Sequence, residues 1–259
     1  MLIALTRAVP PSLERCELTH LEREPIDHAR AVREHALYED TLRRLGCQVE
    51  RLPPLPDHPD SVFVEDTAIV FDEVAVVARP GAASRRGEAE STARALGAYR
   101  PLAAIQPPAT LDGGDVIVTP EVVFVGISGR TNADGARQLA TIVAPFGQRV
   151  VPVPVSGCLH LKSAAVWIPG DGASSILLNP RWVDAAVFAG FERIDVDPGE
   201  PEAANVLAVN GRVLCAEAHA GTRRRLEAHG IATVAVAAAE LAKAEGGVTC
   251  CSIIFAADR

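Results

Sequence analysis

The sequence predicts an α/β protein in which five repeated modules form a ring, and three observations support this fold class. Strand-like and helix-like segments alternate along the chain in the order strand, short turn, strand, helix, strand. Asp115, His160, Asn205 and Cys250 follow one another at intervals of 45 residues, and a fixed period of this size is typical of repeat architectures. One module is divided between the two termini, so that the last strands pair with the first and close the ring.

The modules follow one another in chain order. Four complete modules are expected over residues 62–102, 110–153, 158–196 and 203–236. The fifth begins with VTCCSIIFA near the C-terminus and continues from MLIALTR through a long helix to CQVERL. We expect these modules to form a single domain over residues 1–259.

Local residue patterns place the elements inside each module. β-Branched and apolar runs predict strands over residues 62–71, 73–79, 115–120, 121–127, 149–155, 174–179, 205–209 and 232–237. Apolar residues at helical spacing predict helices over residues 26–46, 84–99, 131–147, 181–190 and 221–230. Gly46 is the expected C-cap of the first of these helices, and its apolar stripe is expected from Ala29, Val32, Ala36, Leu37, Leu42 and Leu45.

Composition excludes several classes of partner. The formal net charge is −8 and no basic stripe occurs, which argues against a nucleic-acid partner and is compatible with a cationic substrate. No apolar run approaches the roughly 18 residues of a membrane span. The six cysteines are scattered without a CxxC pair, and the first residues do not resemble a signal peptide. We therefore expect a cytoplasmic protein with free thiols and no membrane partner.

Polar residues recur where the first strand of each module begins. The equivalent segments are FVEDTA, TLDGGDV, CLHLKS, AANVLA and VTCCSI. If the modules are arranged radially, Asp66, His160 and Cys250 face the central axis and meet in one polar pocket. Together they supply a cysteine nucleophile, a histidine acid/base and carboxylates that hold a cation. His160 is expected in a strand with Cys158 and Lys162 on the same face, and strand alternation directs Cys251 away from Cys250 into the packing.

Each of these residues also has a plain structural interpretation. A single histidine is more often a hydrogen-bonded structural residue, and a cysteine in a valine-rich strand more often packs in a core. Metal binding is a further alternative for Cys, His and Asp together, although no spacing typical of a zinc site occurs. On local sequence alone, Arg85 is a solvated residue at a helix start and Arg130 a turn residue.

Several motifs resemble those of the dimethylarginine dimethylaminohydrolase family, within the guanidino-group-modifying superfamily. The motifs, in the family's order, are FVEDTAIV, RPGAASRRGE, ATLDGGDV, VGISGRTN, HLKSA and GGVTCCS, and the resemblance covers nearly the whole chain. It implies a five-bladed α/β propeller of ββαβ modules with pseudo-fivefold symmetry, which agrees with the repeat.

The resemblance also implies roles for individual residues. Cys250 matches the nucleophile, His160 the acid/base, and Asp112 the carboxylate that orients the histidine. The residues implied to bind substrate are Leu18, Asp60, Glu65, Asp66, Arg85, Arg130 and Ala244. Among them, Asp66 matches the acid that holds the guanidinium, and Glu65 helps to hold the amino end of the substrate. Arg85 and Arg130 match the arginines that take the substrate carboxylate. Leu18 matches a leucine of a flexible lid, and Ala244 offers a backbone contact.

The activity implied is hydrolysis of Nω-methylated arginines to citrulline and dimethylamine or methylamine through a covalent thiouronium on the cysteine. No cofactor or metal is implied, the partner is a small-molecule substrate, and relatives occur as monomers or homodimers. Arginine deiminases and amidinotransferases are the enzymatic alternatives, although deiminases generally carry a helical insertion that 259 residues leave little room for. A non-catalytic propeller that binds arginine-like ligands is the alternative from a different class.

Overall fold

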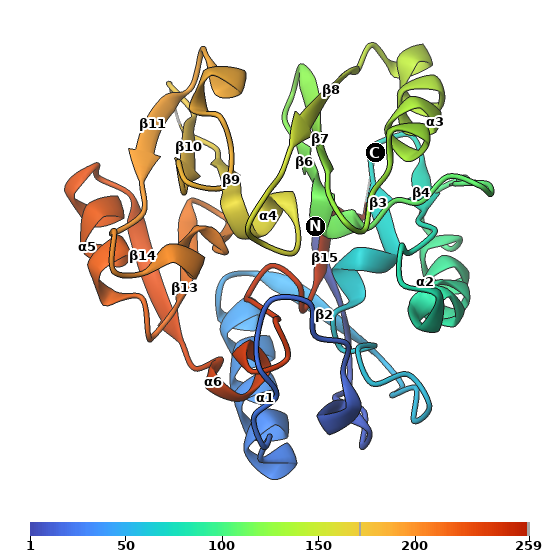
Figure 1. Ribbon diagram of the computed structural model, residues 1–259, viewed down its shortest axis with the longest axis horizontal. Helices are drawn as coiled ribbons and strands as arrows, with labels where there is room; N and C mark the ends of the chain where they lie inside the picture. Colours follow the sequence, from blue (N-terminus) through green and yellow to red (C-terminus); the bar gives the residue numbers. More distant parts are fainter. Residues whose placement is uncertain (171, 258–259) are drawn as a thin grey trace.

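Five three-stranded sheets surround a common centre (Figure 1). The structure is a computed structural model that describes residues 1–170 and 172–257. In every sheet the central strand pairs antiparallel with one neighbour and parallel with the other. The predicted five-module α/β propeller is confirmed.

Each sheet belongs to one module of the ring. The sheets consist of β15 (Ile253–Ala256), β1 (Leu2–Arg7) and β2 (Cys47–Leu52); β3 (Ala68–Val70), β4 (Ala75–Val77) and β5 (Leu102–Ala104); β6 (Val116–Val118), β7 (Val122–Ile127) and β8 (Arg149–Pro154); β9 (Ala165–Ile168), β10 (Ser175–Leu178) and β11 (Glu192–Asp195); and β12 (Leu207–Val209), β13 (Arg212–Ala216) and β14 (Ala232–Val236). The α-helices are α1 (His28–Arg44), α2 (Ala89–Leu96), α3 (Ala133–Val143), α4 (Leu161–Ala164), α5 (Ala220–Ala228) and α6 (Ala239–Ala242). The 3₁₀ turns are η1 (Leu13–Arg15), η2 (Val64–Thr67), η3 (Ala83–Glu88), η4 (Gly113–Asp115), η5 (Ala144–Phe146), η6 (Ala185–Phe188) and η7 (Pro201–Ala204).

The two ends of the chain share one sheet, as the split module predicts. Strand β15 runs antiparallel to β1, with Leu2 opposite Ala256 and Leu5 opposite Ile253. Strand β1 in turn pairs in parallel with β2, which returns after α1. The red C-terminal strand therefore lies within the blue N-terminal module (Figure 1). Closing the ring in this way brings the loop before β15 into contact with other modules, since the Glu65 N–H donates to the Cys250 carbonyl and Asn205 accepts from the Thr249 N–H.

The long helix α1 has the expected ends but a different buried face. Asp27 caps its N-terminus by accepting a hydrogen bond from the Arg30 N–H, and Gly46 follows its C-terminus in the left-handed conformation at φ +90°. The predicted apolar stripe is wrong at Val32 and Leu37, which are 42% and 56% exposed, whereas Leu42 is buried as expected. The buried face instead contains Ala31, Glu34, His35, Tyr38, Glu39, Thr41 and Leu42. Glu39 turns this face inward because its carboxylate accepts hydrogen bonds from Thr6 and Arg51.

Two other expectations fail at the level of local structure. Residues 181–190 form only the short turn η6, so the third complete module lacks an α-helix at this place. The expected strands also start later than predicted, because a single helical turn precedes the inner strand in four modules. These turns are η2, η4, α4 and η7, before β3, β6, β9 and β12.

The segment GCLHLKS is therefore not a strand. Leu161–Ala164 is the single turn α4, and His160 is its N-cap residue. The buried carboxylate of Asp115 accepts a hydrogen bond of 2.9 Å from the Leu161 N–H and fixes the start of this turn. A contact between modules has overridden the strand preference of the local sequence.

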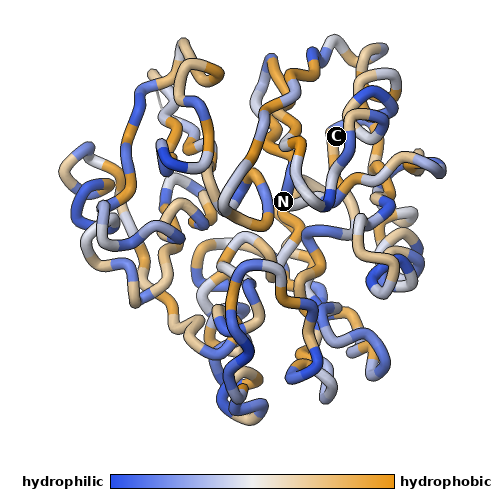
Figure 2. The backbone as a smooth tube through the Cα atoms, viewed as in Figure 1, coloured by the Kyte–Doolittle hydropathy of each residue, from blue (hydrophilic) through white to orange (hydrophobic). Residues whose placement is uncertain are grey.

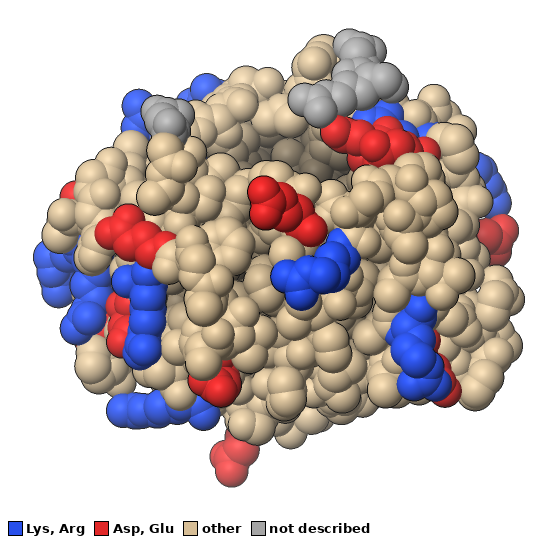
Figure 3. Space-filling model, turned by 90° about the horizontal axis from the view of Figure 1, so that it is seen from above, with Lys and Arg blue, Asp and Glu red and all other residues tan. Residues whose placement is uncertain are grey.

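Apolar residues fill the spaces between the sheets and their helices. Figure 2 shows hydrophobic segments along the strands and hydrophilic segments at the outer rim. Charged residues of both signs occur in small groups on the face drawn in Figure 3. Within the described part of the chain, no helix combines the length and the apolar character needed to cross a membrane.

Candidate active site

The single turns at the inner ends of the modules carry the candidate catalytic residues. Asp66 lies in η2, Asp112 is the N-cap of η4, and His160 is the N-cap of α4. Cys250 lies in the turn that precedes β15. Because the modules are repeated around the ring, residues from four of them reach one place.

His160 lies between two buried carboxylates. Its Nε2 atom is 3.1 Å from Asp112 Oδ2, and its Nδ1 atom is 3.7 Å from Asp66 Oδ1. Burial lowers the pKa of His160, but the charge of Asp66, the hydrogen bond that the ring donates to Asp112 and the charge of Asp115 outweigh it and raise the pKa to about 9. At neutral pH the imidazole is therefore protonated and able to donate a proton.

Gly114 makes this arrangement possible. A Cβ atom at this position would lie 2.6 Å from Asp66 Oδ1 and 2.7 Å from His160 Nδ1, so only glycine leaves room for both side chains. The backbone N–H of Gly114 also donates a hydrogen bond of 3.0 Å to Asp66 Oδ1. The second glycine of the LDGGD motif is thus a packing requirement of the site.

Cys250 is buried, and its sulfur accepts two N–H contacts. The Gly247 N–H lies 3.4 Å from Sγ, and Asn205 Nδ2 lies 3.6 Å from it. Burial and the carboxylates of Glu65 and Asp66 raise the pKa of Cys250 to about 12, although both N–H contacts act in the opposite direction. The thiol of the free protein is therefore protonated at neutral pH.

Cys251 packs in the core as expected, although strand alternation is not the cause. Both cysteines lie in the turn before β15, and the Cys251 thiol donates to the Gly247 carbonyl at 3.4 Å. Its side chain belongs to the same hydrophobic cluster as Tyr38 and Leu42. The turn, rather than an alternating strand, separates the two sulfur atoms.

Cys250 and His160 line the same small cavity. Its volume is about 10 Å³, which is close to the space of one water molecule. Its wall is formed by Glu17, Asp60, Phe63, Asp66, Arg85, Arg130, Leu159, His160, Ala244, Glu245, Gly246 and Cys250. The cavity therefore combines a buried thiol and an imidazolium with carboxylates and two arginines.

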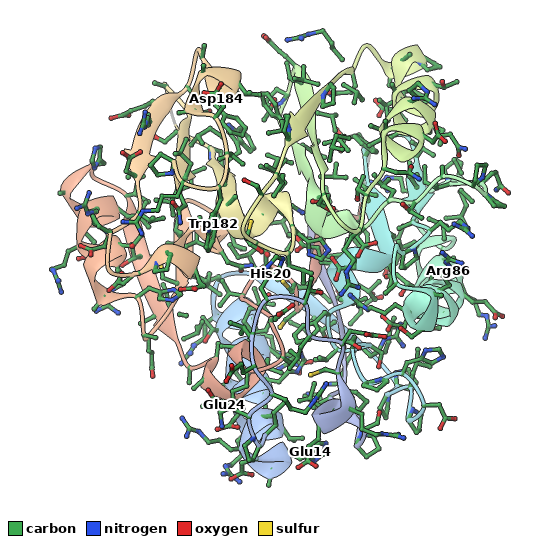
Figure 4. The ribbon with its side chains drawn as sticks, viewed as in Figure 1. Glu14, His20, Glu24, Arg86, Trp182 and Asp184 are labelled. Carbon is green, nitrogen blue, oxygen red and sulfur yellow. The ribbon has the colours of Figure 1, made fainter. Side chains whose placement is uncertain are left out.

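An N-terminal segment, residues 17–21, covers this cavity and is called the lid below. Figure 4 shows the chain passing from Glu14 at the rim to His20 near the centre and back towards Glu24. The carboxylate of Glu245 accepts hydrogen bonds from the backbone N–H groups of Thr19 at 2.9 Å, of Leu21 at 2.7 Å and of His20. Arg130 Nη2 donates to Thr19 Oγ1 at 3.1 Å. A free amino acid is much larger than the cavity in this closed arrangement.

Arg85 is buried and held by acids of its own module. It donates to Asp66 at 2.5 Å and to Glu88 at 2.8 Å, and its Nη2 also reaches the backbone carbonyl of Phe63. These partners raise its pKa well above the ordinary value in spite of burial. The solvated arginine that local sequence alone suggests is wrong, because Arg85 is only 4% exposed.

The other expected binding residues lie at different distances from the cavity. Asp60 and Ala244 line it, and Asp60 accepts hydrogen bonds from the Glu17 N–H of the lid. Glu65 does not line this cavity but a second pocket, between the inner strands of the sheets, where Lys162 Nζ is 2.7 Å from its carboxylate. Leu18 belongs to the lid, but its side chain packs against a core cluster and does not line the cavity.

One group of side chains has the geometry of a metal site. Within residues 1–170 and 172–257, ligand atoms of Asp66, Asp112 and His160 all lie within 4.8 Å of one another. These atoms already have protein partners, since Asp66 pairs with Arg85 and His160 with Asp112. The group therefore fits a hydrogen-bonded imidazolium as it stands.

Comparison with known proteins identifies the family. No protein-family model matches the chain. The chain is 39% identical to the N(G),N(G)-dimethylarginine dimethylaminohydrolase of Streptomyces coelicolor over 251 residues, which are 96% of this chain and 95% of that protein. This chain belongs to the dimethylarginine dimethylaminohydrolase family.

Two solved structures of the dimethylarginine dimethylaminohydrolase family share the fold. The Pseudomonas aeruginosa enzyme, as a cysteine-to-serine variant complexed with citrulline, aligns with a TM-score of 0.92 at 31% identity and covers 97% of this chain and 98% of its own. A histidine-to-glycine variant, solved as an adduct with S-methyl-L-thiocitrulline, aligns with a TM-score of 0.90 at 31% identity, covering 98% of this chain and 100% of its own. The similarity extends over essentially the whole ring.

Four residues at this dimethylarginine dimethylaminohydrolase site were not assigned roles from the sequence. Glu88 holds Arg85, Asp115 fixes the turn that carries His160, Glu245 binds the lid, and Asn205 contacts the Cys250 sulfur. Asp115 and Asn205 share the 45-residue interval with His160 and Cys250, which is a signal that could have marked both. The sequence contains no comparable signal for Glu88 or Glu245.

Proposed function

We propose that the protein hydrolyses Nω-methylated arginines to citrulline and an alkylamine, with Cys250 as nucleophile and His160 as acid and base. The observation that carries this proposal is that Cys250 and a protonated, carboxylate-bound His160 line one lid-covered cavity. Family membership and the citrulline bound by the Pseudomonas aeruginosa relative support the choice of substrate class.

Binding of the substrate cation activates the nucleophile. The guanidinium lies beside Asp66, whose charge favours a cation, and next to the Cys250 thiol. An adjacent positive charge lowers the pKa of a thiol, so the bound substrate offsets the burial and acidic neighbours that keep Cys250 protonated. The thiol proton leaves to solvent, and the thiolate attacks the guanidinium carbon.

His160 serves both half-reactions. As an imidazolium it donates its proton to the departing dimethylamine or methylamine, and the C–N bond breaks to leave a thiouronium on Cys250. The neutral imidazole then removes a proton from water, which adds to the thiouronium carbon. Collapse of this adduct breaks the C–S bond and expels the Cys250 thiolate, the hydroxyl proton is lost to complete citrulline, and the thiolate takes up a proton from solvent to restore the thiol. Asp112 keeps the ring oriented and stabilises its charged form.

The remaining cavity residues recognise the amino-acid end of the substrate. Arg130 supplies positive charge for the α-carboxylate, because it lines the cavity and its guanidinium donates a hydrogen bond to the lid threonine. Arg85 contributes charge from the cavity wall and keeps Asp66 in place. Asp60 and the backbone around Ala244 lie where they can receive the α-amino group. Glu65 acts indirectly, through its pairing with Lys162 behind the site.

A direct assay tests this function. Purified protein is incubated separately with asymmetric dimethylarginine, monomethylarginine and arginine, and citrulline is measured together with kcat/KM for each. The proposal expects citrulline from the methylated substrates and a covalent adduct on Cys250 in acid-quenched samples. Preferred turnover of unmethylated arginine would instead indicate a deiminase, and citrulline formation that survives Cys250→Ser would reject the mechanism.

A further inference from the structure

Asn205 is the only side chain whose amide contacts the nucleophile within the part of the chain that the structure describes. Its Nδ2 atom lies 3.6 Å from Cys250 Sγ, and the Gly247 N–H approaches the same sulfur at 3.4 Å. Asn205 directly follows η7, and in the sequence it lies 45 residues from His160 and 45 residues from Cys250. The two N–H groups come from different parts of the chain and converge on one atom.

The orientation of the Asn205 amide is fixed by its other contacts. The Thr249 backbone N–H donates to Asn205 Oδ1 at 3.0 Å, and a backbone N–H cannot accept. The Thr249 hydroxyl donates to the same oxygen at 3.2 Å. The oxygen of the amide therefore faces Thr249, and the NH₂ group must face the sulfur.

The backbone beside Asn205 is shaped to admit this amide. A Cβ atom on Gly247 would lie 2.2 Å from Asn205 Cγ and 2.5 Å from Nδ2. Any larger residue at position 247 would push the amide away from Cys250. The second glycine of AEGGVTCC thus provides both an N–H donor and the space for the other donor.

A buried thiolate needs such donors. Cys250 is 7% exposed, and the acidic groups around it oppose a negative charge on sulfur. Hydrogen bonds to an ionised group are roughly twice as strong as those between neutral groups, so they favour the thiolate over the thiol. The sulfur becomes negative twice in the reaction, before attack and when the thiouronium breaks down.

We propose that Asn205 is a positioning residue for the nucleophile: its amide and the Gly247 N–H form a two-donor cradle that holds the Cys250 sulfur and stabilises its thiolate. The relevance of this cradle to turnover rests on the proposed function. The effect on the sulfur itself does not, because it concerns the free protein.

Two substitutions of Asn205 separate the loss of its N–H donor from changes in shape and charge. Asn205→Asp has the same shape and keeps an acceptor for Thr249, but it replaces the donor by a carboxylate. Asn205→Leu removes the donor without adding charge. Gly247→Ala tests the same contact from the backbone side. Asn210→Asp is the matched control, because it introduces the same charge at an exposed asparagine whose amide donates to the Leu45 carbonyl.

The first measurement uses the free protein and a neutral reagent. Alkylation of Cys250 by iodoacetamide is followed from pH 7 to pH 10 by tandem mass spectrometry, which separates Cys250 from Cys251. Loss of a hydrogen bond to a charged group predicts alkylation roughly 10-fold slower or more in both Asn205 variants and in Gly247→Ala. Asn210→Asp is expected to follow the wild-type curve. Asn205 variants that also follow it would overturn the proposal.

The second measurement uses turnover. We expect kcat for dimethylarginine to fall about 10- to 100-fold in the Asn205 variants, with KM within roughly twofold, because Asn205 does not line the substrate cavity. Melting temperatures identify any variant that fails to fold. If Asn205→Leu does not fold, the kcat of Asn205→Asp tests the proposal, since this variant keeps the Thr249 contacts. A protein that turns over none of the tested arginines but shows the alkylation shift refutes the proposed function and leaves the cradle intact.

Discussion

Nε2 of His160 lies 3.1 Å from Oδ2 of Asp112, and both side chains are buried. Asp66 approaches the opposite ring nitrogen at 3.7 Å, so a carboxylate faces each nitrogen of the imidazole. This arrangement favours the doubly protonated ring, in which both nitrogens are donors. It explains how a buried histidine retains its charge at neutral pH.

Asp112→Asn tests this relationship. The substitution removes a charge that raises the pKa of His160, so the ring loses its proton at a lower pH than about 9. Turnover needs the imidazolium, and we expect the alkaline limb of the kcat profile to move to lower pH, with kcat at pH 7 reduced about 100-fold. Steady-state assays from pH 6 to pH 10 measure both effects.

A matched variant controls for the loss of charge. Asp184 lies at the outer rim, where its side chain caps η6 (Figure 4). Asp184→Asn should leave the alkaline limb in place. An Asp112→Asn profile that coincides with wild type would show that this carboxylate does not set the protonation of His160.

The adjacent cysteines should respond differently to the same change. Cys250→Ser replaces the sulfur that lines the cavity, and a serine hydroxyl is a far weaker nucleophile at neutral pH, so citrulline formation should be lost. Cys251→Ser alters only a packed side chain that donates to the Gly247 carbonyl, and most of kcat should remain. Comparable loss in both variants, with both proteins folded, would contradict the assignment of the nucleophile.

The lid depends on one carboxylate. Glu245 accepts three successive backbone N–H groups of the lid, from Thr19 to Leu21. Hydrogen bonds to a charged group are worth about 1.5–3 kcal/mol each, so Glu245→Ala should open the lid and raise KM about 10-fold or more. Hydrogen exchange at residues 19–21 should become faster. Cys250 should also react faster with iodoacetamide, which is the opposite of the change expected for Asn205 variants.

Glu24→Ala is the control for the lid prediction. Glu24 is an exposed glutamate that follows the lid and lies near the rim (Figure 4). We expect its substitution to leave KM and hydrogen exchange at residues 19–21 unchanged. If Glu245→Ala matched this control, the three hydrogen bonds would not be what holds the lid closed.

The repeat and the local turns differ in how far the sequence determines them. The 45-residue interval predicts that His160 and Cys250 occupy equivalent places in a ring, because repeated modules put equivalent positions at the same level. The local sequence around His160 predicts a strand, but the structure has the α4 turn there. This turn is fixed by the hydrogen bond from the Leu161 N–H to Asp115, which lies 46 residues away in the sequence. Secondary-structure preference is a weak prior where such a tertiary contact exists.

Polar partners distant in sequence explain the other failures. In α1, Glu39 faces inward because it meets Thr6 and Arg51 from the two neighbouring strands, a pairing that helical periodicity does not contain. Glu245 and the lid are 224 to 226 residues apart, so no local motif connects them. In this fold, sequence motifs identify the candidate catalytic residues. The polar contacts that hold those residues in place depend on which modules are neighbours, and local sequence does not contain that information.

Two adjacent arginines provide a final test of how the cavity wall is supported. Arg85 is buried and bonded to Asp66, to Glu88 and to the Phe63 carbonyl, whereas Arg86 is exposed and donates to the Pro80 carbonyl. Lysine keeps the charge but lacks the planar fork that serves several acceptors at once. Arg85→Lys should therefore reduce the free energy of unfolding by about 2–4 kcal/mol, since it leaves buried acids partly unpaired.

Arg86→Lys should change the free energy of unfolding by less than about 1 kcal/mol, as expected for an exposed side chain. Urea unfolding at pH 7 measures both variants under the same conditions. Because Arg85 also holds Asp66 beside His160, its substitution should weaken substrate binding as well as stability. Equal stability of the two lysine variants would mean that Asp66 and Glu88 find other partners, and that Arg85 does not support the cavity wall.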